Sequence, residues 1–304
     1  MQCLGVFERR RHWKLGFQAI ETALYQNLQD MDEFPRMVGS GSMPATQEIH
    51  IFLAPLNPGE QQLQQYFQLV DTWNASVLPT LRDKGLQCER MKACHLALVF
   101  RRPRGVEEEV CVMQSARYIR SNDPAVVVEQ SHADAQWFRD HGFDVVREKI
   151  EASAYGIDGV PQSDEPAREH EGKRYFEFHM KVRRADREDG SPITAEEIDQ
   201  LKTVAVEFSR AYKIPVPLSF NKRKDKENND GKGHQRFLNL RFRGKGIDNI
   251  KPLVRAVEQR IAEQTAFTVV KTISEWVWYD TYTQMDAGWI DFTEDEFRAA
   301  FIDE

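Results

Sequence analysis

The stretch Glu-Ile-His-Ile-Phe-Leu at Glu48–Leu53 decides the fold, because its pattern returns later as Glu-Phe-His-Met-Lys-Val at Glu177–Val182. In both stretches apolar and polar side chains alternate, which is typical of a β-strand with one buried face. A second matched pair of strands follows at 145–147 and 269–271, and each is followed by a glutamate at the same offset. The sequence therefore predicts two copies of one unit, and we expect a cleft where the copies meet.

Strands and helices are expected in the same order, β-α-β-β-α-β, around both stretches. The elements of the first unit are expected at 48–53, 61–81, 93–100, 110–117, 123–142 and 143–152, and those of the second at 175–183, 194–212, 216–221, 236–243, 248–264 and 267–279. Two helix starts are explicit: Asp123 precedes Pro124, and Thr194 stands three residues before Glu197. This order is the ferredoxin-like plan, a four-stranded antiparallel sheet with both helices on one face.

The predicted fold class is α+β: two βαββαβ ferredoxin-like repeats packed as a pseudo-two-fold duplicated domain, with an N-terminal helical extension. The expected boundaries are 1–46 for the N-terminal helical extension and linker, 47–155 for the first ferredoxin-like repeat, 156–173 for a linker, 174–292 for the second repeat and 293–304 for an acidic tail. Each sheet leaves one face open, and two copies can cover these faces as one barrel or one continuous sheet. We expect a shared polar cleft between them.

Composition limits the class of protein. With 304 residues, of which 41% are hydrophobic, the chain is long enough for a duplicated domain with a substantial core. Its net charge of −7 argues against bulk binding to nucleic acid or to an anionic membrane. There is no apolar run of about 18 residues, so we expect no membrane span. The four cysteines form no Cys-x-x-Cys pair, which argues against structural zinc and favours reduced thiols in a cytoplasmic compartment.

Side chains on a strand alternate between its two faces, so a period of two assigns candidate site residues to the open faces. On the first strand of each unit this rule selects Glu48 with His50, and Glu177 with His179. A histidine exchanges a proton near neutral pH, so these four residues are the candidate catalytic acid/base groups. The candidate ligand-binding residues on the remaining strands are Lys149, Glu151, Lys181, Asn221, Arg241 and Glu275.

Three interpretations of His50 and His179 remain open. In the first they act as general acid and base in one pocket, as in two-histidine phosphoesterases, although that group carries a hydroxyl residue where this chain has Phe52 and Lys181. In the second, both histidines and a glutamate bind a divalent metal as a two-histidine, one-carboxylate set. In the third, the Glu-His pairs and nearby Lys and Arg residues hold the two sheets together through hydrogen-bonded charges.

Positive charge is concentrated in the second unit. The segment Ser209–Lys245 has eleven Lys and Arg residues against three acidic residues. Such an asymmetry indicates an anionic ligand or partner. We therefore expect the chain to bind, and as an enzyme to act on, a small anionic molecule such as a phosphorylated one, held by Lys181, Asn221 and Arg241. No P-loop, Rossmann glycine pattern or Ser-His-Asp order specifies a cofactor or a reaction.

A non-enzymatic protein- or RNA-interaction module is the alternative from another class. The β-α-β-β-α-β unit is also the plan of RNA-recognition domains, in which bases stack on aromatic side chains of the open sheet. Phe52, Tyr175 and Phe237 are the candidates for such stacking. The aromatic-rich signature of the third strand is missing and the net charge is negative, so nucleic acid is the less favoured partner.

Several phrases of the chain resemble a family of duplicated α+β proteins found mainly in bacteria. They are Val145–Glu151, Tyr175–Lys181, Tyr279-Asp280 followed by Asp286–Trp289, and the first-strand stretch Glu48–Leu53. The resemblance covers about residues 47–292 and leaves out the N-terminal extension. It implies the fold and the duplication, and it implies no mechanism, because no activity is established for that family.

Overall fold

The computed structural model describes residues 45–101, 107–184, 193–212, 214, 216–222 and 236–281, all of which belong to the compact unit 37–304. The expected N-terminal helix, most of the lysine-rich loop at 222–233 and the acidic tail lie outside the described residues.

Most elements lie within about three residues of their expected positions. The first half of the described chain contains β1 (Thr46–Leu53), α2 (Glu60–Asp83), β2 (Gln87–Cys88), β3 (Lys92–Arg101), β4 (Glu107–Arg120), α3 (Pro124–Asp140) and β5 (Val145–Ser153). The second half contains α4 (Asp164–Arg168), β6 (Tyr175–Arg184), α5 (Ala195–Tyr212), β7 (Leu218–Asn221), β8 (Arg236–Phe242), α7 (Ile247–Gln264) and β9 (Phe267–Asp280). Strand β2 and helix α4 are additional to the expected elements, because two and five residues are too few to show a periodic pattern.

Side chains at the helix ends confirm two of the expected starts. Asp123 caps α3 by accepting a hydrogen bond of 2.9 Å from the backbone N–H of Ala125, and Pro124 occupies the first helical position. At α5 the backbone N–H of Thr194 donates to the Glu197 carboxylate at 2.8 Å, while the N–H of Glu197 donates to the Thr194 hydroxyl. This reciprocal pair is the capping box that the sequence predicts.

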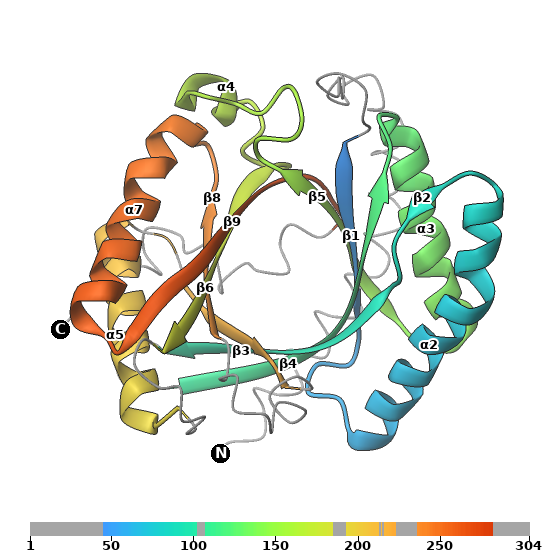
Figure 1. The fold of residues 1–304 in the computed structure, drawn as a ribbon, viewed down its shortest axis with the longest axis horizontal. Coiled ribbons are helices and arrows are strands. Elements are labelled where there is room, and N and C mark those ends of the chain that lie inside the picture. Colours follow the sequence, from blue (N-terminus) through green and yellow to red (C-terminus); the bar gives the residue numbers. More distant parts are fainter. Residues whose placement is uncertain are drawn as a thin grey trace, which may run out of the picture. The chain divides into compact units, whose positions relative to one another are not determined.

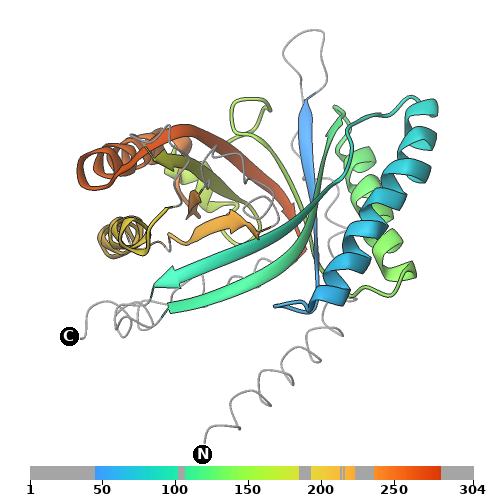
Figure 2. The same ribbon diagram turned by 60° about the horizontal axis from the view of Figure 1, so that its bottom comes forward.

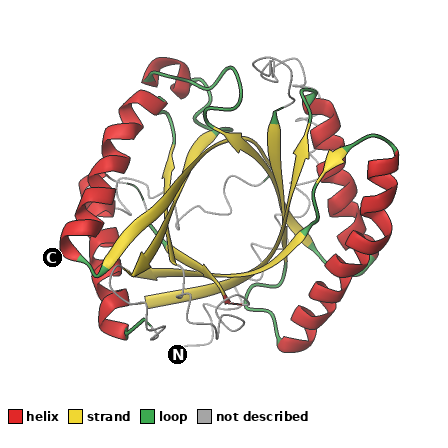
Figure 3. Ribbon diagram, in the orientation of Figure 1, coloured by secondary structure: helices red, strands yellow, loops and turns green. Residues whose placement is uncertain are grey.

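The strands form one sheet that closes on itself (Figure 1, Figure 3). Its order is β1-β5-β9-β6-β8-β7-β3-β4-β2, and a further pairing of β1 with β4 joins its two ends, so that β2 alone extends β4 outside the ring. Helices α2 and α3 lie outside the ring on one side and α5 and α7 on the other, as the turned view in Figure 2 also shows. The molecule's described part is therefore a closed antiparallel β-barrel with an outer layer of helices.

The expected fold class, two βαββαβ ferredoxin-like repeats packed as a pseudo-two-fold duplicated domain, is wrong. The strands do not form two separate sheets: β5 pairs with β9 and β3 pairs with β7, so backbone hydrogen bonds run continuously from one half to the other. The physical reason is that an open sheet leaves unpaired N–H and C=O groups along its edges, and closure into a barrel satisfies them at both seams. The result is one barrel shared by both halves.

Alternation along β1 separates two environments. Ile49, Ile51 and Leu53 are at most 1% exposed and lie on the outer face, where β1 packs against α3. Glu48 and His50 lie on the opposite face and point into the barrel interior. The main apolar core therefore lies between the ring and the helices, and the space inside the ring holds polar side chains together with a smaller apolar cluster around Phe52, Val110 and Val112.

Among the described helices, none combines the length and the apolar character that crossing a bilayer requires.

Candidate functional site

The register of β1 against β5 brings candidate residues together inside the barrel. Glu48 lies directly opposite Glu151, and His50 lies opposite Lys149. Residues that face each other across an antiparallel pair point to the same side of the sheet, so all four side chains share the interior.

His50 is 7% exposed and is held at both ring nitrogens. Its Nε2 lies 2.5 Å from Glu151 Oε1, and the carboxamide of Gln114 from β4 donates to its Nδ1. Because Nδ1 accepts, Nε2 carries the proton and donates to Glu151. The sequence analysis missed Gln114, although it lies two residues from Ala116, the register partner of His50, and therefore on the same face.

Lys149 joins the two halves of the interior. Its Nζ lies 2.6 Å from Glu151 Oε2 and 2.7 Å from Glu177 Oε2, and all three side chains are at most 4% exposed. Burial alone would lower the pKa of Lys149 and raise those of both carboxyls, but the opposite charges outweigh it. The pKa of Lys149 is raised, that of Glu151 is lowered to about 2 by Lys149 and His50, and that of Glu177 is well below its usual range, chiefly because of Arg241.

His179 of β6 bridges two carboxylates that face each other across β6 and β9. Its Nε2 lies 3.3 Å from Glu177 Oε2 and 3.2 Å from Glu275 Oε2, and its Nδ1 lies 2.6 Å from Asn239 Oδ1. Arg241 of β8 forms a further ion pair with Glu177. Burial alone would lower the pKa of His179, but its hydrogen bonds to Glu177 and Glu275 raise it well above its ordinary value. The ring is therefore protonated at neutral pH, and its side chain is 25% exposed.

These hydrogen bonds and ion pairs form one chain of polar side chains across the interior. It contains, in order, His50, Glu151, Lys149, Glu177 and His179. The structure thus places the two predicted histidines in one network. The remaining candidates lie around this chain: Glu48 opposite Glu151, Glu275 and Arg241 beside Glu177, Lys181 two residues along β6 from His179, and Asn221 on β7 opposite Leu96 of β3.

A second buried ion pair, which the sequence analysis missed, joins β5 to β9. Arg147 contacts Asp280 through Nε at 2.9 Å and through Nη2 at 2.5 Å, and the hydroxyl of Tyr175 donates to Asp280 at 2.9 Å. The guanidinium of Arg147 also lies over the ring of Phe52, 5.1 Å from its centroid. Because Tyr175 and Phe52 are 1% and 9% exposed, the base stacking expected of them in the RNA-binding alternative is not available.

Lys181 of β6 and Lys271 of β9 are register partners, so their ammonium groups point to the same face. Lys181 is half-buried and Lys271 is exposed. Within the described residues, neither lysine has an ion-pair partner. The pair is followed by a bulge at Val270, which is 48% exposed, and bulges are over-represented beside functional sites.

Two groups of interior residues have potential metal-ligand atoms within 4.8 Å of one another: Glu48, His50 and Glu151, and Glu151, Glu177 and His179. The histidines fall in different groups. The two-histidine, one-carboxylate set expected as an alternative therefore does not form among the described residues. In the second group the ammonium of Lys149 already lies between the two carboxylates, whereas no cation contacts Glu48 in the described part of the chain.

Another polar cluster lies outside the ring and attaches α3 to the barrel. Glu148 of β5 accepts a hydrogen bond of 3.1 Å from Ser131, lies 2.8 Å from His132 Nδ1 and forms an ion pair with Arg139. The hydroxyl of Ser131 therefore bonds to a carboxylate rather than to the neighbouring histidine, which gives no activated serine nucleophile.

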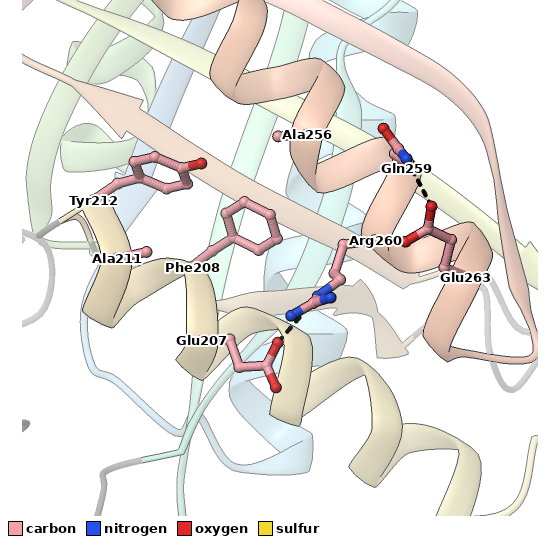
Figure 4. A pocket seen from close by; sticks show the side chains of 8 residues that line it. All are labelled: Glu207, Phe208, Ala211, Tyr212, Ala256, Gln259, Arg260 and Glu263. Atoms are coloured by element: carbon pink, nitrogen blue, oxygen red, sulfur yellow. Dashed lines mark hydrogen bonds and ion pairs between the residues drawn. The ribbon is translucent and has the colours of Figure 1, made fainter.

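A groove of about 330 Å³ lies between α5 and α7, on the outer layer of helices (Figure 4). Phe208 and Tyr212 of α5 line it, and Glu207 of α5 forms an ion pair of 3.3 Å with Arg260 of α7 across it. It is thus separate from the charged network inside the barrel.

No family model matches the chain, and no curated protein matches it. Among solved structures it is similar to a dye-decolorizing protein from V. cholerae, with 9% identity, a TM-score of 0.27 and coverage of 78% of this chain and 94% of that chain. It is also similar to a heme-binding protein from Thermus thermophilus, with 14% identity, a TM-score of 0.26 and coverage of 87% and 98%. A chlorite dismutase from Candidatus Nitrospira defluvii shows 11% identity, a TM-score of 0.24 and coverage of 78% and 92%. Likeness at this level assigns neither a family nor an activity nor a cofactor to the chain.

Proposed function

We propose that the chain binds a small anionic molecule inside the barrel, where β6 and β9 carry Lys181 and Lys271. The proposal rests on the observation that these two lysines lie directly opposite each other on antiparallel strands. Like charges directly opposite each other on antiparallel strands destabilise the sheet. A bound anion between the two ammonium groups replaces this repulsion by two charge-assisted hydrogen bonds.

Two further cationic groups lie on the same interior face, at increasing distance from the lysine pair. His179 lies two residues from Lys181 on the same face of β6, and its raised pKa keeps it positively charged at neutral pH. Arg241 on β8 is 16% exposed on its side chain and is oriented by its ion pair with Glu177. Both groups add to the positive potential that favours an anion between the two lysines.

Lys149 has a different role in this proposal. Its ammonium is enclosed by Glu151 and Glu177, so it balances their charges and positions them rather than binding the ligand. His179 adds positive charge beside the ligand, while its two ring nitrogens stay bonded to Glu177 and Glu275 and to Asn239.

The reversal of charge at Lys271 tests the proposal. Wild-type protein should show a higher Tm with inorganic phosphate or pyrophosphate at constant ionic strength, because a ligand that binds only the folded state stabilises it. In Lys271→Glu a carboxylate faces Lys181, so we expect a higher Tm than wild type without phosphate and no further increase with it. Calorimetric titration of pyrophosphate should show the same loss of binding.

Lys84→Glu is the matched control, since it makes the same change of charge at an exposed position after α2. It should keep the phosphate-dependent increase in Tm. The proposal fails if neither phosphate nor pyrophosphate nor citrate stabilises the wild type, or if Lys271→Glu responds to them as the wild type does.

We further propose that the protein works in the cytoplasm. Cys88, Cys94 and Cys111 are free thiols in the part of the chain that the structure describes. Free thiols persist in reducing compartments, which supports this location.

A further inference from the structure

We infer that Glu48, His50 and Glu151 form a binding site for a divalent transition-metal ion in the barrel interior, where β1 pairs with β5. Their ligand atoms, two carboxylate oxygens and an imidazole nitrogen, lie within 4.8 Å of one another. Ligands around a six-coordinate ion with bonds of about 2.1 Å lie roughly 3 to 4 Å apart, so small side-chain rotations bring these atoms into range. The site is separate from the proposed anion site and does not depend on it.

Two pairs of facing carboxylates in the interior differ in whether a cation lies between their members. Glu177 and Glu275 face each other across β6 and β9, and His179 bridges both through Nε2. Glu48 and Glu151 face each other in the same way across β1 and β5. The first pair thus has a cation between its members, whereas among the described residues none lies between Glu48 and Glu151.

His50 does not bridge its own pair. Its Nε2 lies 2.5 Å from Glu151, while the contact described for Glu48 is a hydrogen bond with the Tyr118 hydroxyl. In the described part of the chain no Lys, Arg or His forms an ion pair with Glu48. Two carboxylates facing each other repel, and a divalent ion between them removes that repulsion.

Gln114 is suited to the outer shell of such a site. It contacts His50 Nδ1 and thereby fixes the plane of the ring. When Nε2 binds a metal, the remaining proton lies on Nδ1, and the Gln114 carboxamide can turn to accept it through Oε1. The equivalent amide, Asn239, cannot turn in this way without losing its hydrogen bonds to Ser219 and Pro217.

The donor set indicates which ions fit. An imidazole with two carboxylates favours Zn²⁺, Mn²⁺ or Fe²⁺ over Mg²⁺, which prefers oxygen ligands and retains its water. In the other interior group both Lys149 and Arg241 already pair with Glu177, whereas Glu48 has no ion-pair partner among the described residues. We therefore expect one ion per chain.

Calorimetric titration of Zn²⁺ into untagged, chelator-treated full-length protein tests the site, with Mn²⁺ as a second probe. We expect binding of one ion per chain in the wild type and an affinity at least tenfold lower in Glu48→Gln, which changes one ligand at nearly constant volume. The matched control is Glu129→Gln, which makes the same change at an exposed position of α3 outside the ring and should bind Zn²⁺ as the wild type does.

The Tm measured in the presence of chelator distinguishes the loss of a metal-ligating side chain from the loss of folding. Glu48→Gln removes the repulsion with Glu151, so its Tm in chelator should equal or exceed that of the wild type, and Zn²⁺ should no longer raise it. If this variant does not fold, Glu48→Asp keeps the charge, withdraws the carboxylate by one methylene group, and should also weaken binding. Absence of stoichiometric binding, or equal Zn²⁺ affinity in the wild type and the Glu48 variant, overturns the inference.

Discussion

At the scale of single residues, two histidines in similar local sequences use Nδ1 differently, because each ring contacts a different neighbouring amide. Asn239 presents Oδ1 to His179, and its Nδ2 is fixed by Ser219 and Pro217, so Nδ1 of the ring must donate. His50 instead accepts from Gln114. The local sequence around each histidine is alike, and residues more than 50 positions away decide the difference.

The charge on His179 leads to a pH-dependent contribution to stability. Its folded pKa is raised well above the ordinary value of about 6.5, so its contribution is complete below about pH 6.5 and is lost as the pH rises through the folded pKa. The difference in unfolding free energy between wild type and His179→Gln should therefore be larger at pH 6 than at pH 9. Urea unfolding in phosphate-free buffer measures it, and His141→Gln, at an exposed helix end, is the control. A difference that grows with pH contradicts the assignment.

At the scale of elements, a buried ion pair links one strand of the barrel to the helices α2 and α3. Arg117 of β4 lies 2.5 Å from Asp134 of α3, and its guanidinium also lies over the ring of Trp73 of α2. Both charged side chains are at most 2% exposed. One residue of a strand thus positions two helices.

Removal of one partner of this pair should be strongly destabilising. Asp134→Leu leaves Arg117 charged and buried, which costs about 3–5 kcal/mol of unfolding free energy. The double variant Arg117→Met, Asp134→Leu should recover most of that loss, because no unpaired charge remains. Denaturant unfolding of both single variants and the double variant measures the coupling. If the double variant loses the sum of the unfolding free energies that the two single variants lose, Arg117 and Asp134 are not coupled and the prediction is wrong.

The element scale also shows how far the sequence predicts this fold. Alternation located β1 and β6, and Asp123 and Thr194 marked the starts of α3 and α5. A period of two sorts side chains between faces but carries no information about which strand edges pair. The seams β5–β9 and β3–β7, which decide between one barrel and one continuous open sheet, could therefore not be predicted.

The same limit applies to the candidate site. His50 and Glu151 were assigned to open faces, but their contact depends on the register in which Glu48 faces Glu151, 103 positions away along the chain. Gln114 and Asp280 were missed because a neutral amide and a strand-end carboxylate look like ordinary surface residues. Only the folded register shows what these side chains contact.

At the scale of the whole molecule, the two halves should unfold together. They share backbone hydrogen bonds at both seams and the buried pairs Lys149–Glu177 and Arg147–Asp280. We expect calorimetry to show one transition for residues 45–281, with equal calorimetric and van't Hoff enthalpies. Two resolved transitions, with far-ultraviolet and tryptophan signals that do not coincide, contradict this expectation.

Ring closure also restricts how this protein associates with others. Open sheets commonly recruit peptides, or further copies of themselves, by adding a strand along an unpaired margin. In the described sheet the terminal strand β2 has only two residues, and every other strand pairs with a neighbour on both sides over at least part of its length. We therefore expect assembly through this part of the chain to use mainly side-chain contacts, made on the helical exterior or at the barrel openings.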